Sequence, residues 1–278
     1  KLGTAVVQLS GRTPTSCAMH ALSLDFLSNG RFSLGLGVSG PQVVEGWYGR
    51  PFPKPLARTR EYIDIIRQVF AREGPVTNDG PHYPLPYPGA DGTGLGKPLK
   101  PITHPLRNKI PIFMGAEGPK NVALAAEIAD GWIPLFYNPY DESVYEQSLK
   151  NMRSDFEINQ MVTVNITDDI AAGLLAVKYF LSFYVGGMGA KTANFHNDLF
   201  CRMGYEEEAS RIQELFFEGK RDEAALVIPD ELADSLALIG PKDRIKERLQ
   251  IWRDSKVTTM LVATADKQQL RDMAELIL

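Results

Sequence analysis

The sequence contains 278 residues, of which 44% are hydrophobic and 23% charged, and its formal net charge at pH 7 is −4. These values are typical of a soluble globular protein, and the absence of a dense Lys/Arg block argues against a nucleic-acid partner. Cys17 and Cys201 lie far apart in the sequence, which argues against a disulfide framework and a cysteine-based metal site. We expect both cysteines to be buried, inert thiols in a reducing, cytoplasmic environment. Because no uninterrupted apolar run approaches about 18 residues and the N-terminus lacks a basic segment before an apolar one, we expect no membrane partner and no signal peptide.

Strands and helices are predicted to alternate along most of the chain. Short runs rich in β-branched residues indicate buried strands, and apolar residues three and four positions apart indicate amphipathic helices. The helix-start signal is clearest at Thr13-Pro14, because Thr is a favourable N-cap and Pro a favourable first residue. In chain order the patterns predict a strand over residues 2–7, a helix over 13–28, a strand over 32–37, a helix over 56–73, a strand over 110–115, a helix over 119–129, a strand over 131–135, a helix over 141–151, a strand over 160–167, a helix over 241–255, a strand over 257–263 and a helix over 266–278.

Two longer segments interrupt this alternation. Residues 75–109 are rich in Pro and Gly and predict a surface insertion with short hairpin pieces, which in a compact domain is usually functional or mobile. Residues 169–240 predict a mostly helical insertion before the last strand. Within it, the glycine-rich stretch from Gly186 to His196 fits either a mobile lid or a plain turn between helices.

The regular alternation of strands and helices predicts an α/β fold built from parallel β-α units, forming a single domain over residues 1–278. The pattern contains about six strands, whereas a closed (β/α)8 barrel needs eight. We therefore expect a TIM-type barrel whose first two β-α units, roughly 50 to 70 residues, precede Lys1. A doubly wound open sheet is the alternative.

The segment from Gly35 to Gly40 matches the G-x-G-x-x-G motif of dinucleotide-binding turns. That motif requires a helix directly after the turn and an acidic residue at the end of the next strand. Residues 41–51 contain too many Gly and Pro residues for a full crossover helix, and the candidate acid, Glu61, lies inside a predicted helix. The glycines therefore indicate a loop that can bind an anion through its backbone N–H groups, on a different architecture.

A second anion-binding turn is predicted where the strand over residues 110–115 ends. Ala116-Glu117-Gly118 follows this strand, and Pro119 begins a helix. A helix N-terminus offers free N–H donors and the positive end of the helix dipole. Two such turns on neighbouring strands are a recurrent phosphate-binding arrangement in barrels.

Several segments together resemble the luciferase-like monooxygenase superfamily, and more narrowly its F420-dependent oxidoreductase branch, which includes methylenetetrahydromethanopterin reductase. The resemblance spans residues 1–278 and is densest over the first 135. It is carried by the segments LGTAVVQLSGRTP, LDFLSNGRFSLGLGVSG, EGWYG, RTREYIDIIRQVF, IPIFMGAEGPKNVALAAEIADGWIP and VTTMLVA.

The resemblance implies a barrel with the coenzyme at its C-terminal face, a homodimer, and Lys1 at the start of the third barrel strand. It implies a non-proline cis peptide at Ala5–Val6, which supports the coenzyme ring. The residues implied to bind the coenzyme are Ala5, Val6, Gly37, Val38, Ser39, Gly40, Ala116, Glu117, Gly118 and Pro119. Glu45, Trp47 and Tyr48 are candidates for lining the substrate pocket. No catalytic acid or base is assigned, because relatives carry that residue after the second barrel strand.

These features favour an oxidoreductase that transfers a hydride between coenzyme F420 and a small organic substrate. One alternative is an FMN-dependent monooxygenase of the same fold, and a second is a non-catalytic coenzyme-binding barrel. The sequence contains no H-E-x-x-H, Cys/His or EF-hand pattern, so we predict no metal site.

Overall fold

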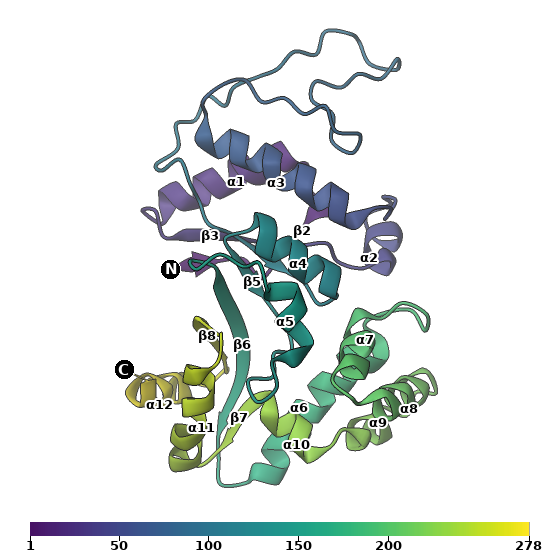
Figure 1. Ribbon diagram of the computed structural model, residues 1–278, viewed down its shortest axis with the longest axis vertical. Coiled ribbons are helices and arrows are strands. Elements are labelled where there is room, and N and C mark those ends of the chain that lie inside the picture. Colours follow the sequence, from purple (N-terminus) through teal and green to yellow (C-terminus); the bar gives the residue numbers. More distant parts are fainter. Residues whose placement is uncertain (278) are drawn as a thin grey trace. The chain divides into compact units, whose positions relative to one another are not determined.

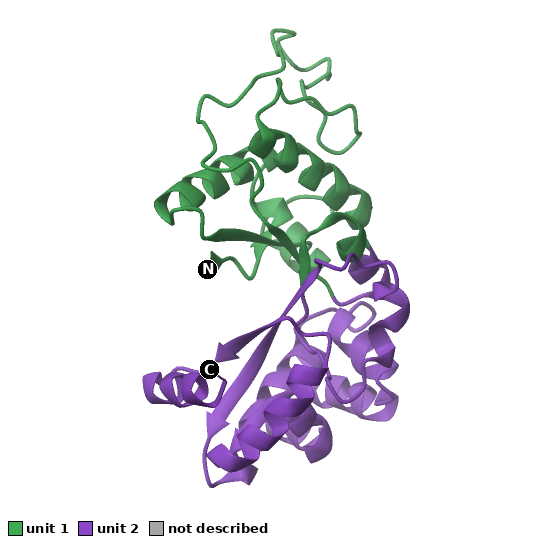
Figure 2. Ribbon diagram, turned by 60° about the vertical axis from the view of Figure 1, so that its left-hand side comes forward, with its two compact units in different colours: residues 1–116, 124–132 green, residues 117–123, 133–278 purple. Residues whose placement is uncertain are grey.

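The computed structural model describes residues 1–277 (Figure 1). The chain divides into two compact units, which are described separately below. Unit 1 contains residues 1–116 and 124–132, and unit 2 contains residues 117–123 and 133–278 (Figure 2).

The strands of unit 1 form a parallel arrangement, as the alternation of elements predicts. The first predicted strand is split into β1 (Leu2–Gly3) and β2 (Val7–Gln8), and both pair with β3 (Phe32–Gly37). On its other side β3 pairs with β4 (Ile112–Gly115), and β5 (Gly131–Ile133) follows in the strand order. Almost all of β3 is buried, which is expected of a parallel strand covered on both faces.

The helices of unit 1 begin where local signals predict them. Helix α1 (Pro14–Leu27) follows a short 3₁₀ turn (Leu9–Gly11), and the Thr13 side chain caps it by accepting a hydrogen bond from the N–H of Ser16 at 3.3 Å. Helix α3 (Pro55–Ala71) packs against α1 and buries one apolar face. The fully buried side chains of that face include Tyr62, Ile63, Ile66, Val69 and Phe70.

The Pro/Gly-rich insertion contains no helix and leaves the helical layer of unit 1 as a long loop (Figure 1). Two antiparallel bridges, Val76–Leu99 and Asn78–Leu85, confirm the predicted hairpin pieces. Glu61 on α3 fixes the loop, because its Oε2 accepts hydrogen bonds from the backbone N–H groups of His82 and Tyr83, both at 3.0 Å. Glu61, which lies inside a helix and so does not fit the acidic position of the dinucleotide motif, therefore has a structural role.

Unit 2 is built around β6 (Glu157–Ile166), which pairs in parallel with β7 (Ala237–Gly240) and β8 (Thr259–Ala263). Helices α11 (Lys242–Asp254) and α12 (Lys267–Ile277) contribute to its core, and α5 (Ser143–Leu149) precedes β6. The buried core cluster consists of Val162, Val164, Leu238, Ile245, Leu249, Trp252 and Met273.

The segment after β6 is mostly helical, with one correction to the prediction. It contains α6 (Ile170–Ser182), a π-helical turn (Phe183–Gly187), α7 (Phe195–Arg202), α8 (Glu206–Phe217), α9 (Arg221–Val227) and α10 (Asp230–Ser235). Residues 237–240, which the sequence pattern assigns to this helical segment, form the buried strand β7. A short apolar run fits a buried strand or a buried helix equally well, and here pairing with β6 decides between them.

Helix α6 and the π-helical turn form one apolar helix, Ile170–Gly187, with a mean hydropathy of 1.5. By length and composition alone this helix is able to cross a membrane, although Lys178 divides its apolar sequence into two shorter runs. Lys178 forms an ion pair with Asp230 at 2.5 Å, and the helix packs against α8, α9 and α10. These are contacts of a helix within a folded helical layer.

Candidate functional site

The carboxyl ends of β3 and β4 carry two glycines that lie opposite each other, Gly37 and Gly115. The Val6 side chain lies against both of them. A Cβ atom added to Gly37 would lie 2.6 Å from Val6 Cγ2, and one added to Gly115 would lie 3.2 Å from Val6 Cγ1. Glycine at position 37 is therefore required by the packing of Val6.

The peptide bond between Ala5 and Val6 is cis, which confirms the cis peptide that the family resemblance implies at this position. It lies in the break between β1 and β2, where the backbone ladder with β3 is interrupted. Thr4 compensates for this interruption, because its hydroxyl donates to the carbonyl oxygen of Gly35 and accepts from the N–H of Gly35, both at 2.9 Å. One side chain thus satisfies both backbone groups of Gly35.

The loop from Gly37 to Gly40 turns away from β3 through a left-handed residue. Ser39 has a φ of +61°, and Gly40 precedes the short helix α2 (Pro41–Gly46). The Gly40 carbonyl accepts hydrogen bonds from the N–H groups of Val43 and Val44. Helix α2 has only six residues, in line with the expectation that this segment forms no full crossover helix.

The second predicted turn leads from β4 into helix α4 (Pro119–Ile128). The carbonyl of Gly118 accepts hydrogen bonds from the N–H groups of Asn121 and Val122, so the helix starts at this glycine. Among the described residues of unit 2, no atom outside the adjoining residues would lie within 4 Å of a Cβ atom added to Gly118. Within unit 2 the space beside Gly118 is therefore open.

Glu117, in the same turn, directs its carboxyl group toward the backbone of Leu135 within unit 2. Its Oε1 accepts a hydrogen bond from the N–H of Leu135 at 2.8 Å, whereas its solvent-shielded Oε2 has no hydrogen-bond partner among residues 1–277. Burial raises the pKa of Glu117 to about 8, although the N–H of Leu135 and the charge of Arg202 act in the opposite direction. The carboxyl group is therefore mostly protonated and neutral at pH 7.

Helix α7 lies beside this turn. Arg202 Nη2 donates a hydrogen bond to the carbonyl oxygen of Glu117 at 3.0 Å. The ring of His196 lies edge-on to Phe136, with 5.7 Å between their centroids, and its Nδ1 has no hydrogen-bond partner in the described part of the chain. Burial lowers the pKa of His196 to about 4, so its imidazole is neutral near pH 7.

The glycine-rich stretch before α7 is held in place by packing and capping. Cβ atoms added to Gly186 and Gly187 would lie 2.6 and 2.3 Å from the Phe216 side chain, so both glycines allow close packing with α8. The buried side chain of Asn194 caps α7 by accepting from the N–H of Asn197 at 3.1 Å and donates to the carbonyl of Val185 at 2.8 Å. These contacts favour the anchored turn over the mobile lid.

The three residues suggested for the substrate pocket have separate environments. Tyr48 donates a hydrogen bond to Gln8 Oε1 at 2.6 Å, and Glu45 accepts one from the N–H of Phe52 at 3.3 Å. Trp47 is 81% exposed. Their role toward a substrate stays a prediction.

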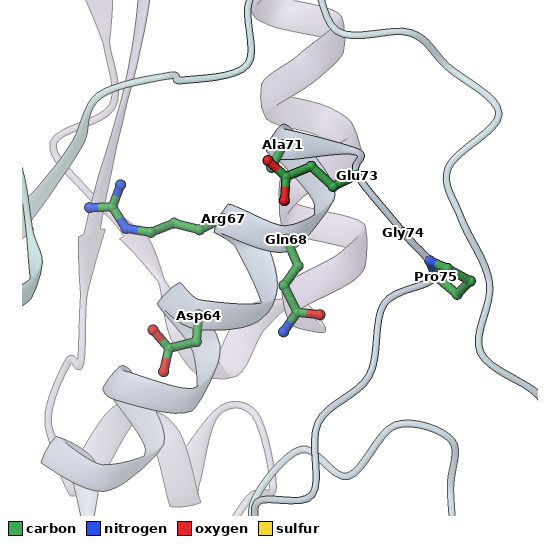
Figure 3. Close-up of a pocket in the computed structure, with 7 residues that line it drawn as sticks. All are labelled: Asp64, Arg67, Gln68, Ala71, Glu73, Gly74 and Pro75. Atoms are coloured by element: carbon green, nitrogen blue, oxygen red, sulfur yellow. The ribbon is translucent and has the colours of Figure 1, made fainter.

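Figure 3 shows a surface pocket of about 490 Å³ on another part of unit 1. It is lined by Asp64, Arg67, Gln68, Ala71, Glu73, Gly74 and Pro75, none of which is a predicted site residue. Several of its polar groups already have partners. Arg67 donates to the carbonyl of Ile128 at 2.8 Å, and the Gln68 side chain both donates to and accepts from the backbone of Thr77. The pocket therefore offers few free polar groups to a ligand.

Sequence reasoning missed Thr4 and Arg202. Thr4 lies in the break between β1 and β2, within a segment that the sequence predicts as one strand, where a hydroxyl carries no signal of its own. Arg202 is 85 residues from the carbonyl that it contacts. Local patterns identify turns and caps, but they do not identify a side chain that reaches a turn from a distant helix.

The parallel strands, the β-α connections and the glycine turns at strand ends define an α/β enzyme fold of the barrel type. Residues 1–259 match the family described as luciferase-like monooxygenase, and the chain belongs to this family. The deduction of barrel architecture and family from the sequence is thereby confirmed.

Similar proteins support the same class. The chain is 57% identical to a Mycobacterium tuberculosis protein named "Putative coenzyme F420-dependent oxidoreductase", covering 100% of this chain and 82% of that protein. It is 26% identical to 5,10-methylenetetrahydromethanopterin reductase of Archaeoglobus fulgidus, over 95% of this chain and 76% of the relative. The chain is therefore an enzyme of the oxidoreductase class.

A solved structure has the same fold. The coenzyme F420-dependent tetrahydromethanopterin reductase of Methanopyrus kandleri superposes with a TM-score of 0.75 at 22% sequence identity. The alignment covers 99% of this chain and 81% of that structure. At this identity the likeness concerns the fold, which is the α/β fold of luciferase-like barrels.

Proposed function

We propose that this protein is an F420-dependent oxidoreductase that transfers a hydride between the deazaflavin coenzyme and a small organic substrate. The observation that carries the proposal is the 57% identity, over the whole chain, to a relative named for F420 dependence. When bound, F420 supplies the hydride chemistry, while the protein contributes binding, orientation and the exclusion of water.

The residues of the chain fit this coenzyme. A phosphate group needs backbone N–H donors that no side chain obstructs, and the open space beside Gly118 at the start of α4 meets this requirement. The glycines of the Gly37–Gly40 loop offer a second such stretch of backbone. Val6, which packs over Gly37 and Gly115, is the residue that we assign to the support of the coenzyme ring.

A binding experiment tests the choice of coenzyme. The purified protein is titrated separately with F420 and with FMN by isothermal calorimetry. We expect saturable binding of F420 with a dissociation constant at least tenfold lower than that of FMN. Micromolar FMN binding without F420 binding would establish the monooxygenase alternative instead.

A matched pair of glycine variants tests the phosphate turn. A Cβ atom added to Gly118 or to Gly74 would meet no other described residue of its own unit within 4 Å, so alanine fits both positions. Gly118→Ala should weaken F420 binding roughly tenfold, because the added methyl group obstructs the approach of the phosphate to the backbone N–H groups and so weakens a hydrogen bond to a charged group. Gly74→Ala should leave it unchanged. Equal affinities of both variants would exclude the turn as the phosphate site.

Turnover identifies the substrate class. Reduced F420 is mixed with the protein and with nitro, enone and imine acceptors, and the absorbance of oxidised F420 is followed. We expect at least one acceptor to accelerate oxidation in proportion to the protein concentration. Tight F420 binding without turnover across the panel would favour a coenzyme-binding role.

We also propose that the protein forms a homodimer. Light scattering coupled to gel filtration tests this directly, because it measures the mass of the particle in solution.

A further inference from the structure

Arg202 places a cationic group beside the turn that follows β4. It is the last residue of α7, and its Nη2 donates to the carbonyl oxygen of Glu117 at 3.0 Å. The side chain is exposed, and this hydrogen bond uses only one of the N–H groups of the guanidinium. The remaining N–H groups of the guanidinium have no hydrogen-bond partner among the described residues, so they are free to bind a ligand.

The charge of Arg202 is not neutralised by a neighbouring carboxylate. Arg202 forms no ion pair within the described residues, although Asp198 and Glu206 are close enough to raise the pKa of the adjacent Cys201. Glu117 is the acidic residue of the turn itself, and its shielded carboxyl group is mostly neutral at pH 7, because its pKa is raised to about 8. The turn therefore presents a positive charge without a matching negative one.

The position of α7 is fixed by polar contacts that do not involve Arg202. The Asn194 side chain caps the helix and binds the carbonyl of Val185, as described above. Asn197 extends the network, because its Nδ2 donates to the carbonyl of Ala209 at 2.8 Å. Replacement of Arg202 should therefore leave the helix in place.

Three independent features of unit 2 converge on the same ligand chemistry. The N-terminus of the ten-residue helix α4 offers N–H donors, and the space beside Gly118 is open. Burial raises the pKa of Glu117 to about 8, so its carboxyl group, whose shielded Oε2 has no hydrogen-bond partner in the described chain, places little negative charge against an incoming anion at pH 7. Arg202 adds a charged donor whose planar geometry suits a phosphate.

We propose that Arg202 is a binding residue for the phosphate group held at the turn Glu117–Pro119. The assignment rests on the proposed function for the identity of the ligand, which is the phosphodiester of F420. It adds a side chain from the helical segment after β6 to a site otherwise made of backbone groups. Arg202 thereby distinguishes the phosphorylated coenzyme from the deazaflavin chromophore alone.

The test compares two ligands and two variants. The ligands are F420 and the deazaflavin that ends at its ribityl alcohol and lacks the phosphate. The variants are Arg202→Gln and, as a control, Arg211→Gln, which removes an exposed arginine of α8 paired with Glu214. We expect Arg202→Gln to raise the dissociation constant of F420 roughly 10- to 100-fold, the range for loss of a hydrogen bond to a charged group. Its affinity for the phosphate-free deazaflavin should change less than twofold, and Arg211→Gln should change neither.

The other outcomes overturn the assignment. If Arg202→Gln loses affinity for both ligands equally, Arg202 has a structural role. If its affinity for F420 is unchanged, Arg202 lies outside the site. If the wild-type protein binds no F420, the proposed function fails, and titration with inorganic phosphate then decides the role of Arg202. Phosphate binding that is weakened in Arg202→Gln but not in Arg211→Gln would support the site. Equal phosphate binding by all three proteins, or none by any, would reject it.

Discussion

Replacement of Arg107 by alanine should destabilise the protein by about 3–5 kcal/mol, because it leaves a buried carboxylate without its partner. Asp25 on α1 is 1% exposed. The Arg107 guanidinium contacts its carboxylate through nitrogen–oxygen distances of 2.7, 3.1 and 3.2 Å. The same guanidinium donates to the carbonyl of Phe32 at the start of β3. Arg107 therefore ties the end of the Pro/Gly-rich insertion to both a helix and a strand.

The expected magnitude follows from the difference in exposure between two ion pairs of unit 1. The Arg107 side chain is 33% exposed and that of Asp25 is 1% exposed, so water cannot replace the lost contact at the carboxylate. In the Arg60–Glu127 pair the exposed fractions are 44% and 62%. Exposed pairs of this kind contribute about 0–1 kcal/mol. Arg60→Ala is thus a matched control for removal of an arginine.

Urea unfolding followed by circular dichroism measures both variants against the wild-type protein. A double-mutant cycle with Asp25→Asn measures the interaction free energy between Arg107 and Asp25. We expect the combined loss of stability in the double variant Arg107→Ala/Asp25→Asn to be smaller than the sum of the two single losses by at least about 2 kcal/mol. The reason is that the double variant no longer contains a buried carboxylate without a partner. A loss below about 1 kcal/mol in Arg107→Ala, equal to that in Arg60→Ala, would refute the reasoning.

Three further predictions concern the strand-end region of unit 1 and the turn that contains Glu117 in unit 2. Thr4→Val should cost about 1–3 kcal/mol in urea unfolding, because both backbone groups of Gly35 lose their partner; an unchanged unfolding midpoint would show that water replaces the hydroxyl. Gly37→Ala should cost about 1–3 kcal/mol through overpacking against Val6, and adding Val6→Ala should restore most of the loss. A double variant as unstable as Gly37→Ala would refute that cause. The pKa of Glu117 is raised from 4.5 to about 8, so the native state holds a proton that the unfolded state releases between these pH values. The contribution of this group to stability is greatest below pH 4.5 and falls by at most about 1.4 kcal/mol per pH unit up to about pH 8. Urea unfolding at pH 5, 6, 7 and 8 should show a flatter dependence for Glu117→Gln, whereas parallel curves would contradict the raised pKa.

Signals within a few residues predicted most of the elements of this fold. Thr13 caps α1 because its hydroxyl is adjacent to free N–H groups, and this relation is visible in the sequence. The strand β7 was missed because four apolar residues carry no period of their own. Its strand conformation depends on pairing with β6, more than 70 residues earlier in the chain. Long-range pairing is the information that a single sequence does not display.

The same distinction separates the predicted from the unpredicted parts of the site. The turn at Gly118 is predictable because a strand, a glycine and a proline follow one another locally. The inward orientation of Glu117 is not predictable, because it depends on the N–H of Leu135 from the loop after β5. An acidic residue in the turn that we propose to bind phosphate looks unfavourable in the sequence. Burial resolves this conflict, because it favours the neutral form of the carboxyl group.

Glycine occupies positions 37 and 40 of the Gly35–Gly40 segment for different physical reasons. This difference explains how the dinucleotide motif arises on this fold. Gly37 is glycine because Val6 occupies the position of its missing side chain, at 2.6 Å. Gly40 has an ordinary extended backbone, and an added Cβ atom would meet only the flexible Gln42 side chain, at 3.1 Å. Substitution at position 37 should therefore act through the strand-end packing, whereas substitution at position 40 should act mainly on a ligand that approaches the loop. The match to the G-x-G-x-x-G motif thus results from a packing constraint at Gly37 and an open stretch of backbone at Gly40. Neither feature requires a crossover helix or a downstream acidic residue.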